Sequence, residues 1–369
     1  MQKEKKVLIV GTGIGGGALS CALADRGLEV HAIDNKPTIS AAGTGICLLG
    51  NTLRALGAIG LKEQCLDQGV PFSMFREFNC EGRELLAFPI GENCGIKRPV
   101  LAHVLESNAS ARGAVLKKNL SVEKIHQAPG QAATVRFTDG TEDEYDLIVA
   151  ADGAYSKLRD EFFGPEYRPK FAKQSVWRFS AKRPDSLDGF QLFRAKDGTA
   201  VGFLPTSKDS CYIFHMENSE DYVRYPEDQL DKLLIDRLSS YSSPVIQEAL
   251  SQIHSADEVL FRPFDITLVP APWHRGRVVL LGDSAHAPTP QLTSGGGMAV
   301  EDAVVLAELL EKLSVDEALE AYTARRFDRV SKIFNASYQL SLYEQDPLAN
   351  REKSAQLLGQ SYQFIAQPC

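Results

Sequence analysis

The sequence contains no run of 18 apolar residues, so it predicts no membrane-spanning helix. Near its start, a charged segment precedes only a short apolar run at Val7–Val10. A secretory signal needs a longer apolar stretch followed by a cleavage site. We therefore expect a cytoplasmic protein.

Cysteine is scarce and irregularly placed. The seven cysteines form no C-x-x-C pair, and the seven histidines are equally dispersed. This pattern is typical neither of a zinc site nor of a disulfide framework. We therefore expect no bound metal, and most cysteines should be small buried residues. The cysteines are Cys21, Cys47, Cys65, Cys80, Cys94, Cys211 and Cys369.

A basic cluster is also missing. The chain has 40 Lys and Arg against 48 Asp and Glu, a formal net charge of −8. Binding to nucleic acid needs a cationic surface, so we exclude nucleic acid as the main partner. With 369 residues, 44 % of them apolar, the chain has the length and composition of a globular protein of about two domains.

Three apolar segments predict strands of one parallel sheet. Val7–Val10 is a continuous apolar run, and Tyr145–Ala151 and Arg277–Leu281 each contain one, as expected for strands buried on both faces. After the first run, Ala18–Arg26 predicts a helix and Glu29–Asp34 a further strand, which completes a βαβ unit.

A different pattern occupies the middle of the chain. From about Phe171 to Asn218, β-rich runs alternate with turn residues, which predicts an antiparallel sheet, and Phe72–Phe88 is a candidate for the same sheet. Beyond residue 298 the spacing is helical, first over Ala299–Leu313 and then over a long stretch from Asp316 to about Tyr343.

The first chemical motif is Gly11-x-Gly13-x-x-Gly16, between a predicted strand and helix. In such a motif the glycines permit a tight turn, close approach of a pyrophosphate and close helix–strand packing. Asp34, 18 residues after Gly16, ends the second strand, where a carboxylate can bind a ribose diol. The motif predicts a dinucleotide site, and the acidic residue favours FAD or NAD over NADP.

Two further motifs follow the other apolar strands. Asp152-Gly153 comes directly after the second, in the pattern A-D-G-x-x-S-x-x-R, which by itself is also typical of a turn. Gly282-Asp283 follows the third, and Gly295–Gly297 then opens a helix. Exposed N–H groups at such a helix N-terminus suit a site of developing negative charge.

In this order and spacing, the three motifs resemble those of the single-component (class A) FAD-dependent aromatic monooxygenases, typified by para-hydroxybenzoate hydroxylase. The shorter salicylate- and urate-hydroxylase-like members are the most similar in shape. The resemblance covers about residues 5 to 340. It also includes Gly43-Thr44-Gly45-Ile46, Asn51-x-Leu53-Arg54-x-Leu56, Arg98-x-x-Leu101, Glu301-Asp302-Ala303 and Tyr322-x-x-x-Arg326.

The resemblance implies an α/β fold: a Rossmann-like FAD-binding domain (GR2-type) interleaved with a mostly antiparallel substrate domain, and C-terminal helices. We expect the FAD-binding domain to comprise residues 1–70, 97–168 and 270–345. We expect the substrate-binding domain to comprise residues 71–96 and 169–269, with residues 346–369 forming a helical tail.

The resemblance also implies roles for individual residues. The pyrophosphate of FAD would lie against Gly11, Gly13, Ile14, Gly15 and Gly16. Asp34 and Asn35 would lie at the adenosine ribose and Leu120 beside the adenine. The remaining cofactor contacts would come from Gly45, Arg98, Asp152, Asp283, Gly295, Gly296 and Gly297. We expect the FAD to bind non-covalently.

The sequence departs from the family pattern at two places. Asp34 stands where Glu is commoner, which shortens the reach to the ribose. In the loop that usually has the pattern Gly-x-Gly-x-Asn, Thr293 and Gly297 occupy the outer positions.

The activity implied by the resemblance is hydroxylation of an aromatic or heteroaromatic small molecule. NAD(P)H, a transient co-substrate, would reduce FAD, and O₂ would form a C4a-hydroperoxyflavin that transfers one oxygen atom. Oxidation of a polycyclic compound such as a tetracycline-type antibiotic is an alternative on the same fold. The W-x-W-x-I-P motif of flavin halogenases is absent. A non-catalytic nucleotide-binding redox sensor would leave the second and third motifs unexplained.

The substrate is expected between the flavin and the antiparallel sheet, with Arg178, Tyr212 and His215 as candidate pocket residues. Arg178 could bind a carboxylate or phenolate, or form a salt bridge between domains. Tyr212 matches a position that urate-hydroxylase-like members use near substrate. Aromatic residues of the same strands, either lining the pocket or forming core, are Trp177, Phe193 and Phe203.

Overall fold

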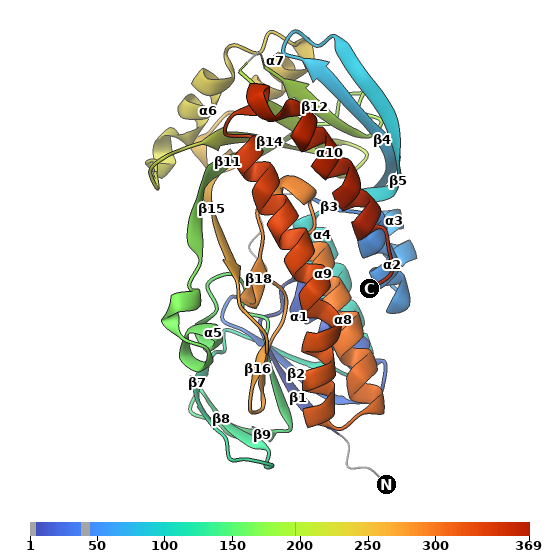
Figure 1. Ribbon diagram of the computed structural model, residues 1–369, viewed down its shortest axis with the longest axis vertical. Helices are drawn as coiled ribbons and strands as arrows, with labels where there is room; N and C mark the ends of the chain where they lie inside the picture. The colour runs from blue at the N-terminus through green and yellow to red at the C-terminus, as the bar shows by residue number, and fades with distance from the viewer. Residues whose placement is uncertain (1–4, 38–44, 196) are drawn as a thin grey trace.

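The computed structural model describes residues 5–37, 45–195 and 197–369. Gly43 and Thr44 of the family-like segment therefore lie outside the described residues. The fold combines two large sheets with helices, which confirms the predicted α/β class (Figure 1).

The smaller of the two large sheets has six strands in the order β16-β17-β10-β1-β2-β6. All neighbours are parallel except β16 and β17. The central strands are buried on both faces, as their continuous apolar sequences predict. The strands are β1 (Lys6–Val10), β2 (Glu29–Asp34), β6 (Val115–Lys118), β10 (Leu147–Ala150), β16 (His274–Arg275) and β17 (Val278–Leu280).

Helices pack closely beside this sheet. α1 (Ile14–Ala24) contacts both α4 (Arg98–Ala111) and α8 (Gly295–Lys312). A Cβ atom at Gly17 would lie 3.0 Å from Cβ of Leu105, so α1 and α4 approach at van der Waals distance. α9 (Val315–Tyr343) runs along α8, and α10 (Pro347–Ile365) folds back along α9 (Figure 1).

One helix begins earlier than the sequence predicts. α1 starts at Ile14 rather than Ala18, whereas α8 starts at Gly295, where the glycine run predicts that a helix opens. Glycine has a low helix propensity, so the pattern placed the start of α1 at the first alanine. Tertiary packing overrides that preference, and it places the glycine motifs in the first helical turns.

The largest sheet has nine strands in the order β18-β15-β11-β14-β13-β12-β4-β5-β3. All pairs are antiparallel except β12 with β4. It contains both the predicted 171–218 region and the 72–88 segment. The strands are β3 (Gly45–Leu48), β4 (Val70–Asn79), β5 (Glu84–Lys97), β11 (Lys170–Lys182), β12 (Phe190–Arg194), β13 (Ala200–Pro205), β14 (Ser210–Asn218), β15 (Leu260–Leu268) and β18 (His286–Ala287).

One face of this sheet is covered by α6 (Leu230–Leu238) and α7 (Pro244–Leu250), which share an apolar core with it.

Two strands cross the expected domain boundaries. β3 and β18 lie in segments expected to belong to the FAD-binding domain, yet both pair within the nine-stranded sheet. The two units are therefore joined by shared strands as well as by packing.

The remaining elements are short. They are the three-stranded sheet of β7 (Val122–His126), β8 (Ala133–Phe137) and β9 (Glu142–Tyr145), and helices α2 (Gly50–Ala58), α3 (Lys62–Gln68) and α5 (Lys157–Phe162).

The described residues contain no disulfide bond, and five of the seven cysteines are buried. Within the described part of the chain, no helix is both long and apolar enough to cross a membrane.

Candidate functional site

The glycine turn between β1 and α1 is tightly constrained. Gly11 has a φ of +103°, and a Cβ atom there would lie 2.3 Å from the carbonyl oxygen of Ala151. A Cβ atom at Gly16 would lie 1.9 Å from the carbonyl oxygen of Gly11, and one at Gly15 would lie 2.7 Å from Cδ2 of Leu281. At Gly13, in contrast, a Cβ atom would meet nothing within 4 Å. Packing therefore requires glycine at positions 11, 15 and 16, whereas Gly13 faces open space.

The N-terminus of α1 has no side-chain cap. The first N–H groups of a helix have no partner within the helix, and they carry partial positive charge. An anionic pyrophosphate fits this position, beside the open space at Gly13.

Asp34 is fixed at the end of β2, beside the same turn. Its carboxylate accepts hydrogen bonds from the Thr12 backbone N–H at 2.9 Å, from the Thr12 hydroxyl at 3.1 Å and from the Lys36 N–H at 3.0 Å. The Leu120 N–H donates to the Asp34 carbonyl oxygen at 3.0 Å, whereas the neighbouring Asn35 is exposed. The structure thus brings Asp34 and Leu120 to one edge of the sheet.

The second and third motifs are hydrogen-bonded to each other. The Ser284 hydroxyl donates to Asp152 at 3.2 Å and accepts from the Gly153 N–H at 3.1 Å. The other carboxylate oxygen of Asp152 accepts from the Lys157 N–H at 2.9 Å. Asp152 therefore joins two loops and the start of α5 through local hydrogen bonds.

Asp283 follows β17, in the loop before α8. Its side chain is accessible, and among the described residues no hydrogen-bond partner is found for its carboxylate. Desolvation by the surrounding protein raises its pKa, although His286 and Arg98 oppose the shift. A Cβ atom at Gly295 would lie 3.9 Å from Asp283 Oδ1, which places this carboxylate beside the start of α8.

The starts of α1 and α8 meet at the same place. A Cβ atom at Gly296 would lie 3.0 Å from Cδ1 of Ile46 on β3 and 3.6 Å from Cδ1 of Ile14. One at Gly297 would lie 2.3 Å from the Thr52 hydroxyl oxygen, so even a methyl group there would displace α2 or α8. α8 also lacks a side-chain cap. Two helix N-termini without side-chain caps and the carboxylate of Asp283 thus lie close together, a donor and acceptor set that fits FAD.

The loop before α8 has a partner that the sequence did not indicate. Thr293 adopts a left-handed conformation with φ +53°, and its side chain lies near enough to the Tyr362 hydroxyl of α10 to act on the pKa of that hydroxyl. Desolvation raises the pKa of Tyr362 to about 12. Residues 346–369 carry no motif, so only the structure identifies Tyr362 as a neighbour of this loop.

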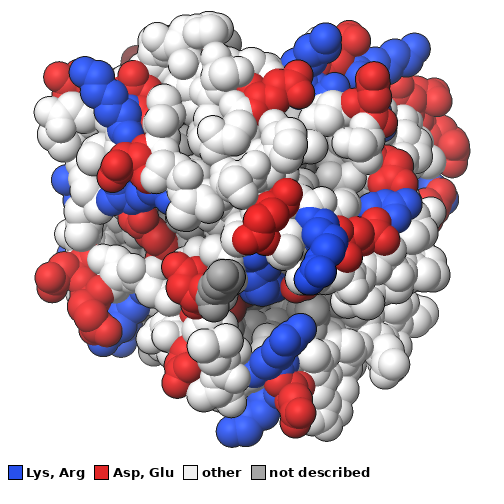
Figure 2. All heavy atoms as spheres, turned by 90° about the horizontal axis from the view of Figure 1, so that it is seen from above, with Lys and Arg blue, Asp and Glu red and all other residues white. Residues whose placement is uncertain are grey.

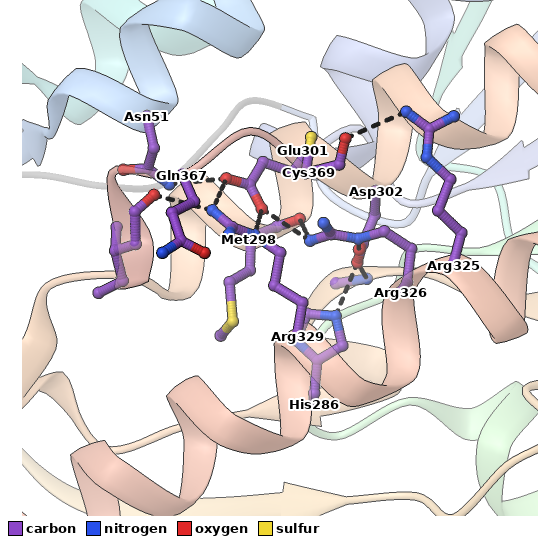
Figure 3. Close-up of polar contacts among 12 residues, drawn as sticks. Asn51, His286, Met298, Glu301, Asp302, Arg325, Arg326, Arg329, Gln367 and Cys369 are labelled. Carbon is purple, nitrogen blue, oxygen red and sulfur yellow. Dashed lines mark hydrogen bonds and ion pairs between the residues drawn. The ribbon is translucent and has the colours of Figure 1, made fainter. Parts of the chain in front are cut away.

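A buried ionic network lies behind α8, and Figure 3 shows its side chains pointing toward one another. Asp302 contacts His286 Nε2 at 2.6 Å and Arg326 Nε at 2.7 Å, and it accepts from the Gly282 N–H at 3.1 Å. Burial by itself raises the pKa of Asp302, but His286 and Arg326 outweigh burial and lower it to about 2. The network therefore connects the loop of Asp283 to α8 and α9.

Glu301 forms the second half of this network. It contacts Arg329 at 2.9 Å through two nitrogens, Arg326 at 2.9 Å and the side-chain amide of Asn51 at 2.9 Å. Arg329 also donates to the carbonyl oxygen of Ile365 at 2.8 Å. Glu301 therefore links α8 to α2, α9 and the end of α10.

Arg98, at the start of α4, is acted on by the charges of Arg178 and Tyr212, which lie on one face of the nine-stranded sheet. Burial lowers the pKa of the Arg98 guanidinium, and the charge of Arg178 lowers it further, whereas Tyr212 and Asp283 act in the opposite direction. A Cβ atom at Gly45 would lie 2.7 Å from Cβ of Tyr212. Nε of Arg178 is buried and has no hydrogen-bond partner among the residues that the structure describes.

His215 lies on the other face, away from Arg178 and Tyr212. Side chains alternate along β14, so His215 and Tyr212 point to opposite sides. His215 is buried, its Nδ1 lies 3.1 Å from the Ala200 carbonyl oxygen, and its ring packs against Tyr241. The structure thus places His215 on the sheet face opposite Arg178 and Tyr212. Trp177, Phe193 and Phe203 belong to the same apolar core under α6 and α7.

Comparisons with known proteins agree with this geometry. Residues 4–337 match the family described as FAD binding domain. The chain is 29 % identical to 6-hydroxynicotinate 3-monooxygenase from Pseudomonas fluorescens, over 92 % of this chain and 91 % of that protein. It is 30 % identical to aurachin C monooxygenase/isomerase from Stigmatella aurantiaca, over 92 % and 90 %. The crystal structure of Klebsiella pneumoniae HpxO complexed with FAD and uric acid matches with a TM-score of 0.84 and 23 % identity, over 99 % of this chain and 93 % of that one.

Proposed function

Because the chain belongs to the FAD-dependent monooxygenases of the FAD binding domain family, we propose that it hydroxylates a small aromatic or heteroaromatic ring that carries a negatively charged oxygen group. It is an enzyme with FAD as cofactor and NAD(P)H and O₂ as co-substrates. Family membership thereby sets aside the redox sensor. When bound, FAD supplies the oxidation–reduction chemistry.

We assign the cofactor contacts to the two helix N-termini and the residues between them. The free N–H groups at the start of α1 would bind the pyrophosphate, and Asp34 would bind the adenosine ribose. Asp283 would bind the ribityl hydroxyls, because its carboxylate has no other hydrogen-bond partner in the described residues. The start of α8 would stabilise negative charge on the isoalloxazine edge.

The observation that carries the substrate proposal is the arginine pair. Arg98 and Arg178 are close enough to lower the pKa of Arg98, and Arg178 has a buried N–H without a partner in the described part of the chain. Asp283 opposes this shift at Arg98, whereas the Nε–H of Arg178 has no partner among the described residues. A carboxylate or ring oxygen anion would satisfy Arg178, and 6-hydroxynicotinate, named for one relative, has this chemistry.

The same pair would orient the ring. Guanidinium groups hold an oxygen anion by directional hydrogen bonds, and the Tyr212 hydroxyl lies on the same sheet face to complete the set. No observation specifically favours a polycyclic substrate of the tetracycline type.

The test starts from the FAD-loaded enzyme. The purified protein should be yellow, and aromatic acids and hydroxylated nitrogen heterocycles should accelerate NAD(P)H oxidation, with products one oxygen atom heavier. In Arg178→Gln, loss of charge-assisted hydrogen bonds of about 1.5–3 kcal/mol should raise KM roughly 10- to 100-fold. Lys182→Gln, which removes an exposed charge from the same strand, is the control. An unchanged KM in Arg178→Gln would overturn the anion-binding role.

A further inference from the structure

A row of aromatic rings runs from the proposed ring site to the surface. It consists of Tyr212 and Phe214 on β14, Phe190 on β12, Phe75 on β4 and Phe88 on β5. Successive ring centroids are 5.8, 6.0, 5.8 and 5.1 Å apart in that order. We call these five residues the aromatic ladder.

The ladder lies on the same sheet face as Arg178. Arg178 is the register partner of Phe214, and Phe75 is the register partner of both Phe190 and Phe88. Paired residues of neighbouring strands point to the same side of a sheet. Arg178 therefore lies opposite Phe214, one ring from the Tyr212 end of the ladder, and Phe88 stands at the other end.

A glycine makes the ladder continuous across β13. A Cβ atom at Gly202 would lie 2.1 Å from Cζ of Phe214, so the ring of Phe214 lies directly over this residue. Any side chain at position 202 would displace the ring and interrupt the path toward Phe190. The floor beside the ladder is apolar as well, because Phe190 and Tyr212 pack against the buried Phe72 and Leu204.

The ladder becomes more exposed with distance from Arg178. Tyr212, Phe214, Phe190 and Phe75 are half-buried, whereas Phe88 is 39 % exposed. Its neighbours on the same face of β5, Leu86 and Ile90, are 50 % and 36 % exposed. Figure 2, which views the molecule from above, shows broad uncharged areas between mixed acidic and basic groups. Glu77 on β4 forms an ion pair with Arg194 on β12 at 3.1 Å.

We propose that the aromatic ladder binds an apolar, flexible substituent of the substrate while Arg178 holds the anionic oxygen. The inference rests on the proposed function, because the ladder begins at Tyr212 of the proposed ring site. A ligand bound here would have a charged head and a hydrocarbon tail that extends toward Phe88. The continuity of the ladder with that site favours the substrate itself over a separate partner.

The test uses straight-chain carboxylates, which carry head and tail without a ring. Butanoate, hexanoate, octanoate and decanoate, each below its self-association concentration, are titrated into the FAD-loaded enzyme by calorimetry. Transfer of one methylene from water to an apolar site is worth about fourfold in binding, so we expect a roughly two- to fourfold fall in Kd per added methylene.

Three variants separate the head from the tail. Phe75→Ala combined with Phe190→Ala should reduce the gain to less than about 1.5-fold per methylene, because the apolar contact area is removed. Arg178→Gln should weaken all four ligands by one common factor. Ile235→Ala, an exposed apolar position on α6 at the opposite sheet face, should change nothing. Circular dichroism and flavin content verify that each variant folds.

Equal Kd values for the four chain lengths would overturn the proposal, and so would an unchanged length dependence in the double variant. A second copy of the chain covering the ladder would also overturn it. In that case Phe88→Glu would convert a dimer to a monomer in light scattering without altering the length dependence. If carboxylates bind as expected but no aromatic compound accelerates NAD(P)H oxidation, the ladder stands and the proposed function fails.

Discussion

Replacement of Asp302 by Asn tests the buried network behind the proposed flavin site. Asp302 is fully buried, and its carboxylate contacts His286, Arg326 and the backbone of Gly282. The amide retains the size of the side chain but removes its charge. Arg326 would then keep only Glu301 as a carboxylate partner.

The magnitude follows from the pKa and from the burial of the pair. Folding lowers the pKa of Asp302 from 3.8 to about 2, which corresponds to about 2 kcal/mol of stability at neutral pH. Breaking a buried ion pair by removing one partner costs about 3–5 kcal/mol. We therefore expect Asp302→Asn to lower the free energy of unfolding by about 2–5 kcal/mol at pH 7.

The pH dependence has a defined sign. Because folding lowers this pKa, the carboxylate contributes fully above pH about 4, its value in the unfolded chain, and loses its contribution as pH falls toward 2. The difference between wild type and variant should therefore shrink below pH about 4. Urea unfolding of the FAD-saturated proteins, from pH 7 down to the lowest pH at which the wild type stays folded, measures it.

The control is Asp316→Asn on α9, whose exposed ion pair with Arg277 should contribute at most about 1 kcal/mol. A loss below about 0.5 kcal/mol for Asp302→Asn at pH 7 would refute the reasoning. A difference between wild type and variant that stays constant between pH 7 and pH 3 would refute the proposed electrostatic origin.

Three further outcomes are expected. Gly11→Ala, which would press a methyl group against the Ala151 carbonyl at a φ of +103°, should abolish FAD retention, measured as the flavin-to-protein absorbance ratio. Tyr362→Phe, which removes the hydroxyl beside Thr293, should weaken FAD binding roughly two- to tenfold in a flavin-fluorescence titration while the unfolding midpoint stays near that of wild type. His215→Gln should leave KM for the aromatic substrate unchanged in NAD(P)H oxidation assays, because His215 lies on the far face of the sheet. It should lower the free energy of unfolding by about 1–3 kcal/mol, because the buried carbonyl oxygen of Ala200 loses its contact with the imidazole. A KM change in this last variant would place His215 in the pocket after all.

Local patterns in the sequence predicted most of the strands, turns and helices of the fold. Continuous apolar runs predicted β1, β10 and β17, because strands buried on both faces have no polar positions. The glycine motifs predicted the tight turns, since a Cβ atom at Gly11 or Gly16 would overlap the backbone. The helical spacing of apolar residues over a long stretch predicted the start of α9 to within one residue.

Pocket residues were harder to predict. Alternation along β14 separates Tyr212 from His215, but it does not tell which face meets α6 and α7 and which stays open. Both faces of this strand carry aromatic residues, so hydrophobicity does not distinguish them. Packing of distant helices makes this choice, and it placed His215 in the core.

The sequence by itself determined the class of fold, the cofactor and the turns that approach it, because glycine spacing and strand burial depend on neighbouring residues. Only the tertiary structure decided which side chains lie close together. It brought Tyr362 to Thr293, Arg178 to Arg98, and five rings from four strands into one row. These contacts join residues separated by tens of positions along the chain, and their geometry is set by sheet register and helix packing.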